Sequence, residues 1–393
     1  MKYLTFLALL VALLGISGTH PSNHHNWTAQ ELATLQSLTL ANLPPATDPS
    51  NRFAQNPPAL ALGRQLFFER RLSRNGSIAC ATCHQPAKAF TDGKPLASAL
   101  ATGTRNTPSL LGVAHQDWFF WDGRKDSLWS QALEPLENPA EHGLTRTEVV
   151  RLLLTDTHYQ QQYQALLKNI PTADMLQQLP LAASPQGDLV QLQAWKHLPP
   201  AQREQIDAVF AATGKFLAAY VSSLNLATNK LDALAQQPAA LNPNESAGAK
   251  LFIGKAQCIL CHSGALLSNQ TFQNIGTGIL GKDSGRAAVL DTLRTDRFNC
   301  QGKHSDTPPE TCTELQFLTR NRHAVTGEFK VPGLRNVAKT APYFHDGRFT
   351  TVEQVIDYYT QAAPPNAPDD NDLPRIQLNE TEKHQLLAFL KIL

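Results

Sequence analysis

The chain has 393 residues, of which 42% are hydrophobic and 17% are charged, a balance typical of a globular protein with a sizeable core. Lysine and arginine total 34 against 33 aspartate and glutamate residues, without long runs of one charge. The sequence therefore carries no electrostatic sign of a nucleic-acid or membrane-surface partner, and its length allows two or three domains.

The N-terminus has the layout of a secretory signal peptide. Met1-Lys2 precedes an apolar run from Leu4 to Ile16, which ends among small residues. As a helix this run would rise about 20 Å, short of the roughly 30 Å of a bilayer's hydrocarbon core, so no membrane span is expected. We predict a signal peptide over residues 1–20 and export to the periplasm; the alternative is a buried N-terminal helix.

The rest of the chain predicts a mainly α fold, because helical periodicity is frequent and strand patterns are poor. Helices are expected near residues 58–70, 126–136, 147–168, 202–235, 244–254, 351–360 and 379–391. The long 202–235 segment gives way to the polar, proline-containing sequence Gln236-Gln237-Pro238. We place a domain boundary there, which gives an N-terminal domain over residues 21–237 and a C-terminal domain over residues 238–393.

Four of the six cysteines lie in two CxxCH motifs, and each motif predicts one covalently attached haem c. Two thiols three residues apart reach both haem vinyl groups, and the adjacent histidine supplies an imidazole to iron. The cofactor-binding residues are therefore Cys80, Cys83, His84, Cys258, Cys261 and His262. A Gly-x-x-Leu-Phe repeat precedes each motif and favours two related haem domains in tandem. The alternatives are a redox CxxC pair, a zinc site or a disulfide.

Cys300 and Cys312 remain, in a stretch from residue 277 to residue 328 with little periodicity. In an oxidising compartment two leftover thiols most simply form a disulfide, which would pin this loop.

Further motifs follow the same order along the chain: Arg105-Asn106-Thr107-Pro108, Phe120-Trp121-Asp122-Gly123-Arg124, Phe329-Lys330-Val331-Pro332 and Ala341-Pro342-Tyr343-Phe344-His345-Asp346-Gly347. With the two CxxCH motifs, the chain from about residue 60 onwards resembles the bacterial di-haem cytochrome c peroxidases, and within them the MauG-like branch, which oxidises side chains of partner proteins. The resemblance implies two mainly helical cytochrome c-like domains. Hydrogen peroxide would react at the N-terminal haem, and the C-terminal haem would relay electrons.

The same resemblance assigns the distal pocket of the N-terminal haem to Glu141 as the acid–base catalyst, with Gln131 and Pro135 as polar and shape-setting neighbours. Residues 91–104 contain no histidine, where typical peroxidases of the family carry a distal histidine ligand. An iron site open from the start is therefore expected. From spacing alone, Glu141 would instead be a solvated loop carboxylate.

Two aromatic residues complete the electron path that the resemblance implies. Trp121 would lie between the haems and relay electrons, although an aromatic run is otherwise typical of a core. Tyr359, fourteen residues after His345, matches the sixth ligand of the C-terminal haem; a tyrosinate would lower its potential, where a methionine would raise it. The alternative for Tyr359 is simple packing on an apolar face.

The resemblance also implies a calcium ion between the domains, held by the Asn106 carboxamide and the main-chain carbonyls of Thr340 and Pro342. Our leading prediction is a periplasmic di-haem oxidoreductase that reacts with hydrogen peroxide and oxidises a residue of a partner protein. A conventional peroxidase fed by a small redox protein is the closest alternative, and a non-enzymatic di-haem electron carrier is a third. MauG-type enzymes carry a tryptophan two residues before the second CxxCH, where this chain has Ala256, and this favours the conventional peroxidase.

Overall fold

The computed structural model describes residues 27–234, 237, 240–277, 283–361, 373 and 376–393, and the predicted signal peptide lies outside them. The described chain is mainly helical, as predicted, and its β-structure is limited to the antiparallel pair β1 (Phe272–Gln273) and β2 (Phe329–Lys330). The helices are α1 Ala29–Ser37, α2 Pro57–Phe68, α3 Cys80–Cys83, α4 Leu128–Glu137, α5 Arg146–Thr155, α6 Thr157–Leu166, α7 Ala173–Gln178, α8 Leu189–His197, α9 Pro200–Ser222, α10 Lys230–Ala233, α11 Pro243–Ile253, α12 Leu290–Thr295, α13 Thr313–Gln316, α14 Val352–Thr360 and α15 Glu380–Leu390. Within these residues no helix combines the length and apolar character needed to cross a membrane.

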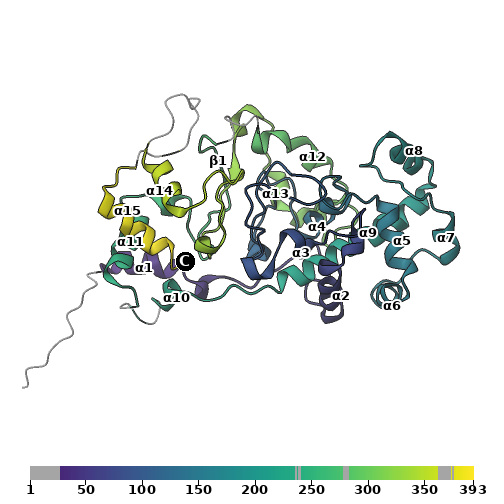
Figure 1. Ribbon diagram of the computed structural model, residues 1–393. Helices are drawn as coiled ribbons and strands as arrows, with labels where there is room; N and C mark the ends of the chain where they lie inside the picture. Colours follow the sequence, from purple (N-terminus) through teal and green to yellow (C-terminus); the bar gives the residue numbers. More distant parts are fainter. Residues whose placement is uncertain (1–26, 235–236, 238–239, 278–282, 362–372, 374–375) are drawn as a thin grey trace, which may run out of the picture.

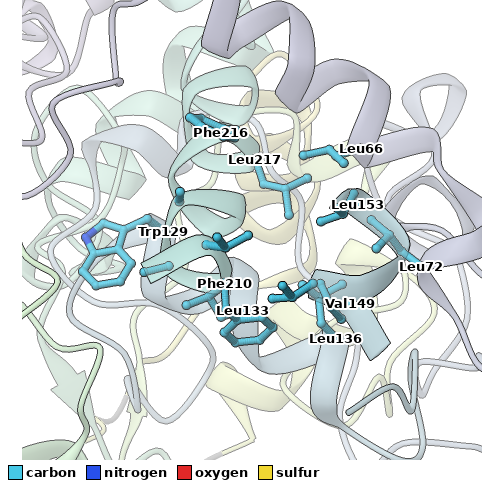
Figure 2. Close-up of a cluster of buried hydrophobic side chains, with 14 of the residues drawn as sticks. Leu66, Leu72, Trp129, Leu133, Leu136, Val149, Leu153, Phe210, Phe216 and Leu217 are labelled. Carbon is cyan, nitrogen blue, oxygen red and sulfur yellow. The ribbon is translucent and has the colours of Figure 1, made fainter. Parts of the chain in front are cut away.

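The first hydrophobic core surrounds α9, in which every residue from Val209 to Val221 is buried. A helix buried on all sides must be covered by several neighbours, and α2, α4 and α5 pack against it. Figure 2 shows apolar side chains of these helices converging around Phe210 and Leu217.

The second core lies at the other end of the molecule, where α1, α11, α14 and α15 gather (Figure 1). Phe252 of α11 and Phe389 of α15 are fully buried at its centre. Leu35 of α1 and Leu231 of α10 also belong to this core, although both lie in the range predicted as the N-terminal domain. The boundary at residue 237 stays a prediction.

The Gly-x-x-Leu-Phe repeat has the same packing role in both cores. A Cβ atom on Gly63 of α2 would lie 1.8 Å from the Phe216 carbonyl oxygen of α9, and one on Gly248 of α11 would lie 1.9 Å from the Gln385 carbonyl oxygen of α15. Only glycine allows such close backbone approach, so each repeat presses one helix against its partner just before a CxxCH motif.

Two of the predicted helices end earlier than expected. The 147–168 segment is broken at Asp156, whose carboxylate caps α6 by accepting hydrogen bonds from the main-chain N–H groups of His158 and Tyr159. The 202–235 segment stops at Ser222, and α10 begins only after Asn229, which caps it. In both cases a short polar side chain competes for the backbone groups that a continuous helix would use. The other five predicted helices agree with α2, α4, α11, α14 and α15 to within two residues.

The loop after β1 is pinned by the predicted disulfide, since Cys300 and Cys312 are bonded with their Cα atoms 5.8 Å apart. It is also tied to the first core, because Asp306 accepts a hydrogen bond from the Lys215 Nζ of α9 at 2.6 Å. A segment late in the chain thus braces the N-terminal half of the molecule.

Candidate active site

A single cavity of about 680 Å³ extends between the two cores and is lined by residues of both CxxCH motifs. The predicted site residues that line it are Cys83, His84, Asn106, Trp121, Gln131, Pro135, Glu141, Cys258, Cys261, His262, Thr340, Pro342 and Tyr359. Cys80, the first residue of the first motif, instead packs against the first core. The structure therefore brings together residues that are spread over more than 270 positions of the sequence.

The first motif forms one helical turn, α3, whose start is fixed by a hydrogen bond from the Ala79 N–H to the Thr82 hydroxyl. His84 follows, with its Nδ1 3.1 Å from the carbonyl oxygen of Phe90. Because a carbonyl can only accept, this contact favours the tautomer with its proton on Nδ1, in which Nε2 keeps a lone pair for a metal. Burial lowers the pKa of His84, which favours the neutral imidazole that ligates iron.

The second motif repeats this arrangement on a 3₁₀ turn over Cys258–Leu260. Here the His262 Nδ1 lies 3.0 Å from the carbonyl oxygen of Leu267, and burial again lowers the pKa of the imidazole. In both motifs a backbone carbonyl five or six residues later in the chain thus favours the tautomer that can bind a metal through Nε2.

The four motif cysteines are thiols rather than disulfides. Burial raises the pKa of Cys80 and of Cys258 to about 12, whereas a redox-active CxxC pair needs a thiolate at neutral pH. Among the described residues no three His, Cys, Asp or Glu side chains form a metal-binding cluster, so the zinc alternative finds no ligand set there. At each motif, two thiols lie beside a histidine that can bind a metal. This arrangement is compatible with a haem attached through two thioether bonds.

Helix α4 forms one wall of the cavity and carries Gln131 and Pro135. Pro135 lies inside the helix and has no N–H to donate to the Gln131 carbonyl, a defect that normally costs a helix stability. Glu141 follows α4 and is held by the Asn138 amide, which donates to its Oε1 at 2.7 Å. Burial raises the pKa of Glu141, against the opposing charge of Arg124. The Glu141 carboxyl therefore lines the cavity and is oriented by its hydrogen bond from Asn138.

The turn before α4 has a structural duplicate before α14 that our sequence analysis missed. Phe120 and Phe344 have φ values of 66° and 68°, Gly123 and Gly347 have φ values of 64° and 62°, and each turn is closed by a β-bridge. The signal was present in the sequence as Phe-Trp-Asp-Gly-Arg and Phe-His-Asp-Gly-Arg.

This duplication relates the two helices that follow, because Ser127 caps α4 as Thr351 caps α14. Position fourteen after Trp121 is Pro135, and position fourteen after His345 is Tyr359. The two halves of the chain thus carry a proline and a tyrosine at equivalent places.

Tyr359 lies at the edge of the second core and lines the cavity. Burial raises the pKa of its phenol, so an ionised oxygen there needs a nearby positive charge such as ferric iron. The neighbouring Tyr358 points elsewhere, since its hydroxyl donates to the Ile275 carbonyl at 2.5 Å. Met175 lies in α7 and packs against the first core, on the far side from this site.

Trp121 connects the two halves of the cavity wall. Its indole Nε1 donates to the Asn106 carbonyl at 2.9 Å, and its own carbonyl accepts from the Lys330 N–H at 2.7 Å. The Asn106 N–H in turn donates to the His345 carbonyl at 2.6 Å. Trp121 is therefore fixed by segments from both halves.

The three residues predicted to hold calcium all line the same cavity. The Asn106 amide nitrogen donates to the Lys94 carbonyl at 2.8 Å, which turns the amide oxygen away from that contact. Within the described chain neither this oxygen nor the main-chain carbonyls of Thr340 and Pro342 accept a hydrogen bond. The donors suit a hard cation such as Ca²⁺.

Comparisons with known proteins identify the family of this chain. Residues 57–239 match a protein family described as di-haem cytochrome c peroxidase. Methylamine utilization protein MauG of Methylorubrum extorquens is 31% identical over 343 residues, which cover 86% of this chain and 78% of that protein. Cytochrome-c peroxidase IdrP2 of Denitromonas iodatirespirans is 27% identical over 402 residues, covering 100% of this chain and 92% of that protein.

Among solved structures, a MauG-like protein associated with microbial copper homeostasis superimposes with a TM-score of 0.61. It is 25% identical, and the match covers 89% of this chain and 94% of that one.

Proposed function

Because this chain belongs to the di-haem cytochrome c peroxidase family, we propose that it is an exported oxidoreductase of the MauG-like branch, which reacts with hydrogen peroxide and oxidises a residue of a partner protein. Peroxidase-type oxidoreductase chemistry is common to the family's named members, both MauG and the cytochrome-c peroxidases. The open questions are therefore which haem meets peroxide and where the electrons come from.

We assign one haem c to each CxxCH motif, in two tandem cytochrome c-like domains with His84 and His262 as proximal ligands. When bound, the haems supply the iron that reacts with peroxide and the second redox centre that shares the oxidising equivalents. Mass spectrometry after expression with a haem c maturation system should show two covalent haems. A smaller number would contradict the assignment.

The single observation that carries the proposal is the pairing of Pro135 with Tyr359 in the duplicated turn and helix. A phenol oxygen can fill the sixth position on iron, whereas a proline side chain has no donor atom. At the N-terminal site Pro135 would therefore leave a bound haem iron without a protein ligand on this side, in agreement with the absence of histidine from residues 91–104. Peroxide would then have access to that site without the loss of a side-chain ligand.

We assign proton transfer at the N-terminal site to Glu141. A buried carboxyl with a raised pKa can accept a proton from peroxide and return it to the departing oxygen. The Asn138 amide orients it, and Gln131 offers a second polar group on the same wall.

Trp121 is the proposed electron relay between the two sites, because it is fixed at the cavity wall by both halves of the chain. Tyr359 is the proposed sixth ligand of the C-terminal haem. As an anionic oxygen ligand, Tyr359 would favour oxidised iron and lower the reduction potential of a haem bound there.

A conventional peroxidase supplied by a small redox protein is the second candidate, and Ala256 favours it. Ala256 is fully buried and lines the cavity, so it offers no oxidisable side chain toward a partner at this place. A di-haem electron carrier is a weaker candidate, because carriers usually fill both axial positions of each haem.

Export is supported by the Cys300–Cys312 disulfide, since disulfides persist mainly in oxidising compartments such as the periplasm. The oxygen set of Asn106, Thr340 and Pro342 supports a structural calcium ion beside Trp121. We expect a chelator to perturb communication between the haems without removing either one.

The decisive experiment measures peroxide turnover with and without a reduced c-type cytochrome, while haem absorption and EPR follow both sites. Oxidation of the enzyme by peroxide without prior reduction, with little acceleration by the cytochrome, supports the MauG-like branch. A requirement for reductive activation and fast cytochrome oxidation would establish the conventional peroxidase instead. If the protein does not react with peroxide at all, the remaining candidate function is that of a di-haem electron carrier.

A further inference from the structure

Lys330 places a basic side chain in the wall of the cavity that both CxxCH motifs line. It ends β2, and its Nζ donates to the Gln116 side-chain oxygen at 2.5 Å. The charge of the exposed carboxylate Asp117 acts on it, but among the described residues the two form no ion pair within 4.0 Å. The side chain that directly hydrogen-bonds to the ammonium, Gln116, is therefore neutral.

Two other lysines with little exposed surface, Lys125 and Lys215, form ion pairs with aspartates. Lys125 pairs with Asp296, and Lys215 pairs with Asp306 at 2.6 Å. Burying a charge without an opposite charge is costly, so such pairing is the ordinary solution. Lys330 therefore has the environment of a cation whose anion is supplied by a ligand of the cavity.

The duplication within the chain places this cation relative to the predicted haem sites. Asn106-Thr107-Pro108 precedes the first Phe-x-Asp-Gly-Arg turn, and Lys330-Val331-Pro332 precedes the second. The carbonyl of Pro108 lies against His84 as that of Pro332 lies against His262.

The cross-links between the halves follow the same symmetry. The Asn106 N–H donates to the His345 carbonyl, and the Lys330 N–H donates to the carbonyl of Trp121, the residue equivalent to His345. Lys330 is therefore the counterpart of Asn106, whose amide oxygen is one of the proposed ligands of a cation. One half offers an oxygen for a cation at this place, and the other half supplies an ammonium.

We propose that the Lys330 ammonium, oriented by Gln116, binds a carboxylate of a bound haem, one of its propionate groups. Attachment through the vinyl groups leaves the two propionates of each haem as anions that the cavity must accommodate. A propionate beside the ammonium would supply the opposite charge that its hydrogen-bond partner Gln116 lacks, so the two groups would satisfy each other. Burial lowers the pKa of Lys330 to about 8, and a neighbouring carboxylate would raise it again.

This proposal rests on the proposed haem sites and is tested on the mature holoprotein. We would replace Lys330 with methionine and with glutamine, which remove the charge at similar length, and with arginine, which retains it. Lys215→Met is the matched control, because it removes a lysine that is buried and paired outside the cavity. Each variant is examined by mass spectrometry, redox titration of both haems, and the propionate-bending bands of resonance Raman spectra.

We expect both neutral variants to keep two covalent haems, with the potential of one haem lowered and its propionate-bending band shifted. The potential falls because a positive charge near the haem stabilises the reduced form. Lys330→Arg should keep the potential closer to that of the wild type while still shifting the band, since the guanidinium contacts the carboxylate with a different geometry. Lys215→Met should change neither potential nor band.

Two haems with unchanged potentials and unchanged bands in the Lys330 variants would overturn the proposal while leaving the haem assignment intact. Absence of covalent haem from the wild type would overturn the proposed function as well. If the neutral variants do not assemble, Lys330→Arg decides, because a propionate band identical to that of the wild type excludes contact between residue 330 and a haem carboxylate.

Discussion

Replacing Pro135 with tyrosine tests whether the two haem sites differ mainly by the residue at this one place. Pro135 occupies the position on α4 that Tyr359 occupies on α14, after turns of matching conformation. The variant should therefore present a phenol to the N-terminal iron and convert an open site into a closed one.

The effect on the helix itself is small by comparison. Any residue other than proline restores an N–H that can donate to the Gln131 carbonyl, which contributes about 0.5–1.5 kcal/mol. Loss of proline's rigidity in the unfolded chain offsets this by about 0.4–1 kcal/mol. Pro135→Ala makes the same backbone change without a ligand and should leave both stability and peroxide reactivity near the wild-type values.

The assay compares haem spin state by EPR and the rate of reaction with peroxide in the wild type, Pro135→Tyr and Pro135→Ala. We expect a six-coordinate N-terminal haem and a rate at least about 100-fold lower in Pro135→Tyr only, which corresponds to about 2.7 kcal/mol in favour of the closed site. An open site and a wild-type rate in Pro135→Tyr, with both haems present, would refute the structural equivalence on which the proposed function depends.

Three further predictions concern the acid–base group, the axial ligand and the helix packing. Glu141→Gln should keep both haems but react with peroxide about 100-fold more slowly. Because burial raises the pKa of Glu141, the wild-type rate should increase with pH around a pKa above the usual carboxyl range. Stopped-flow measurements over a range of pH should show that this increase is lost in the variant. Tyr359→Met should raise the potential of the C-terminal haem in a redox titration, whereas Tyr358→Phe should not, and equal potentials in all three proteins would exclude Tyr359 as ligand. Gly248→Ala should lower the free energy of unfolding by about 1–3 kcal/mol, because the added Cβ would lie 1.9 Å from the Gln385 carbonyl oxygen; thermal melts that match the wild type would contradict this.

Much of this protein's chemistry follows from spacings of a few residues, and these are legible in the sequence. The CxxCH motifs, the helices around them and the pairing of Cys300 with Cys312 depend on short-range geometry or on the small number of candidates. The Gly-x-x-Leu-Phe repeat is of the same kind, although the reason for its glycine became clear only from the backbone that approaches Gly63 and Gly248.

Helix ends were less predictable where polar side chains take part. Apolar periodicity continues through Asp156 and beyond Ser222, but capping and side-chain hydrogen bonds end the helices there. Periodicity reports which face is buried, whereas the end of a helix depends on single hydrogen bonds of about 1 kcal/mol.

By itself the sequence determined the cofactor motifs, the mainly helical fold and the family resemblance that nominated Glu141, Trp121 and Tyr359. Only the tertiary structure decided that these residues line one cavity, that α1 packs into the core of the C-terminal half, and that Pro135 and Lys330 stand where the other half has Tyr359 and Asn106. The physical reason is that local spacing fixes how neighbours in the chain are arranged, whereas contacts between distant segments are selected by the burial of apolar surface and by the charges that this burial leaves without partners.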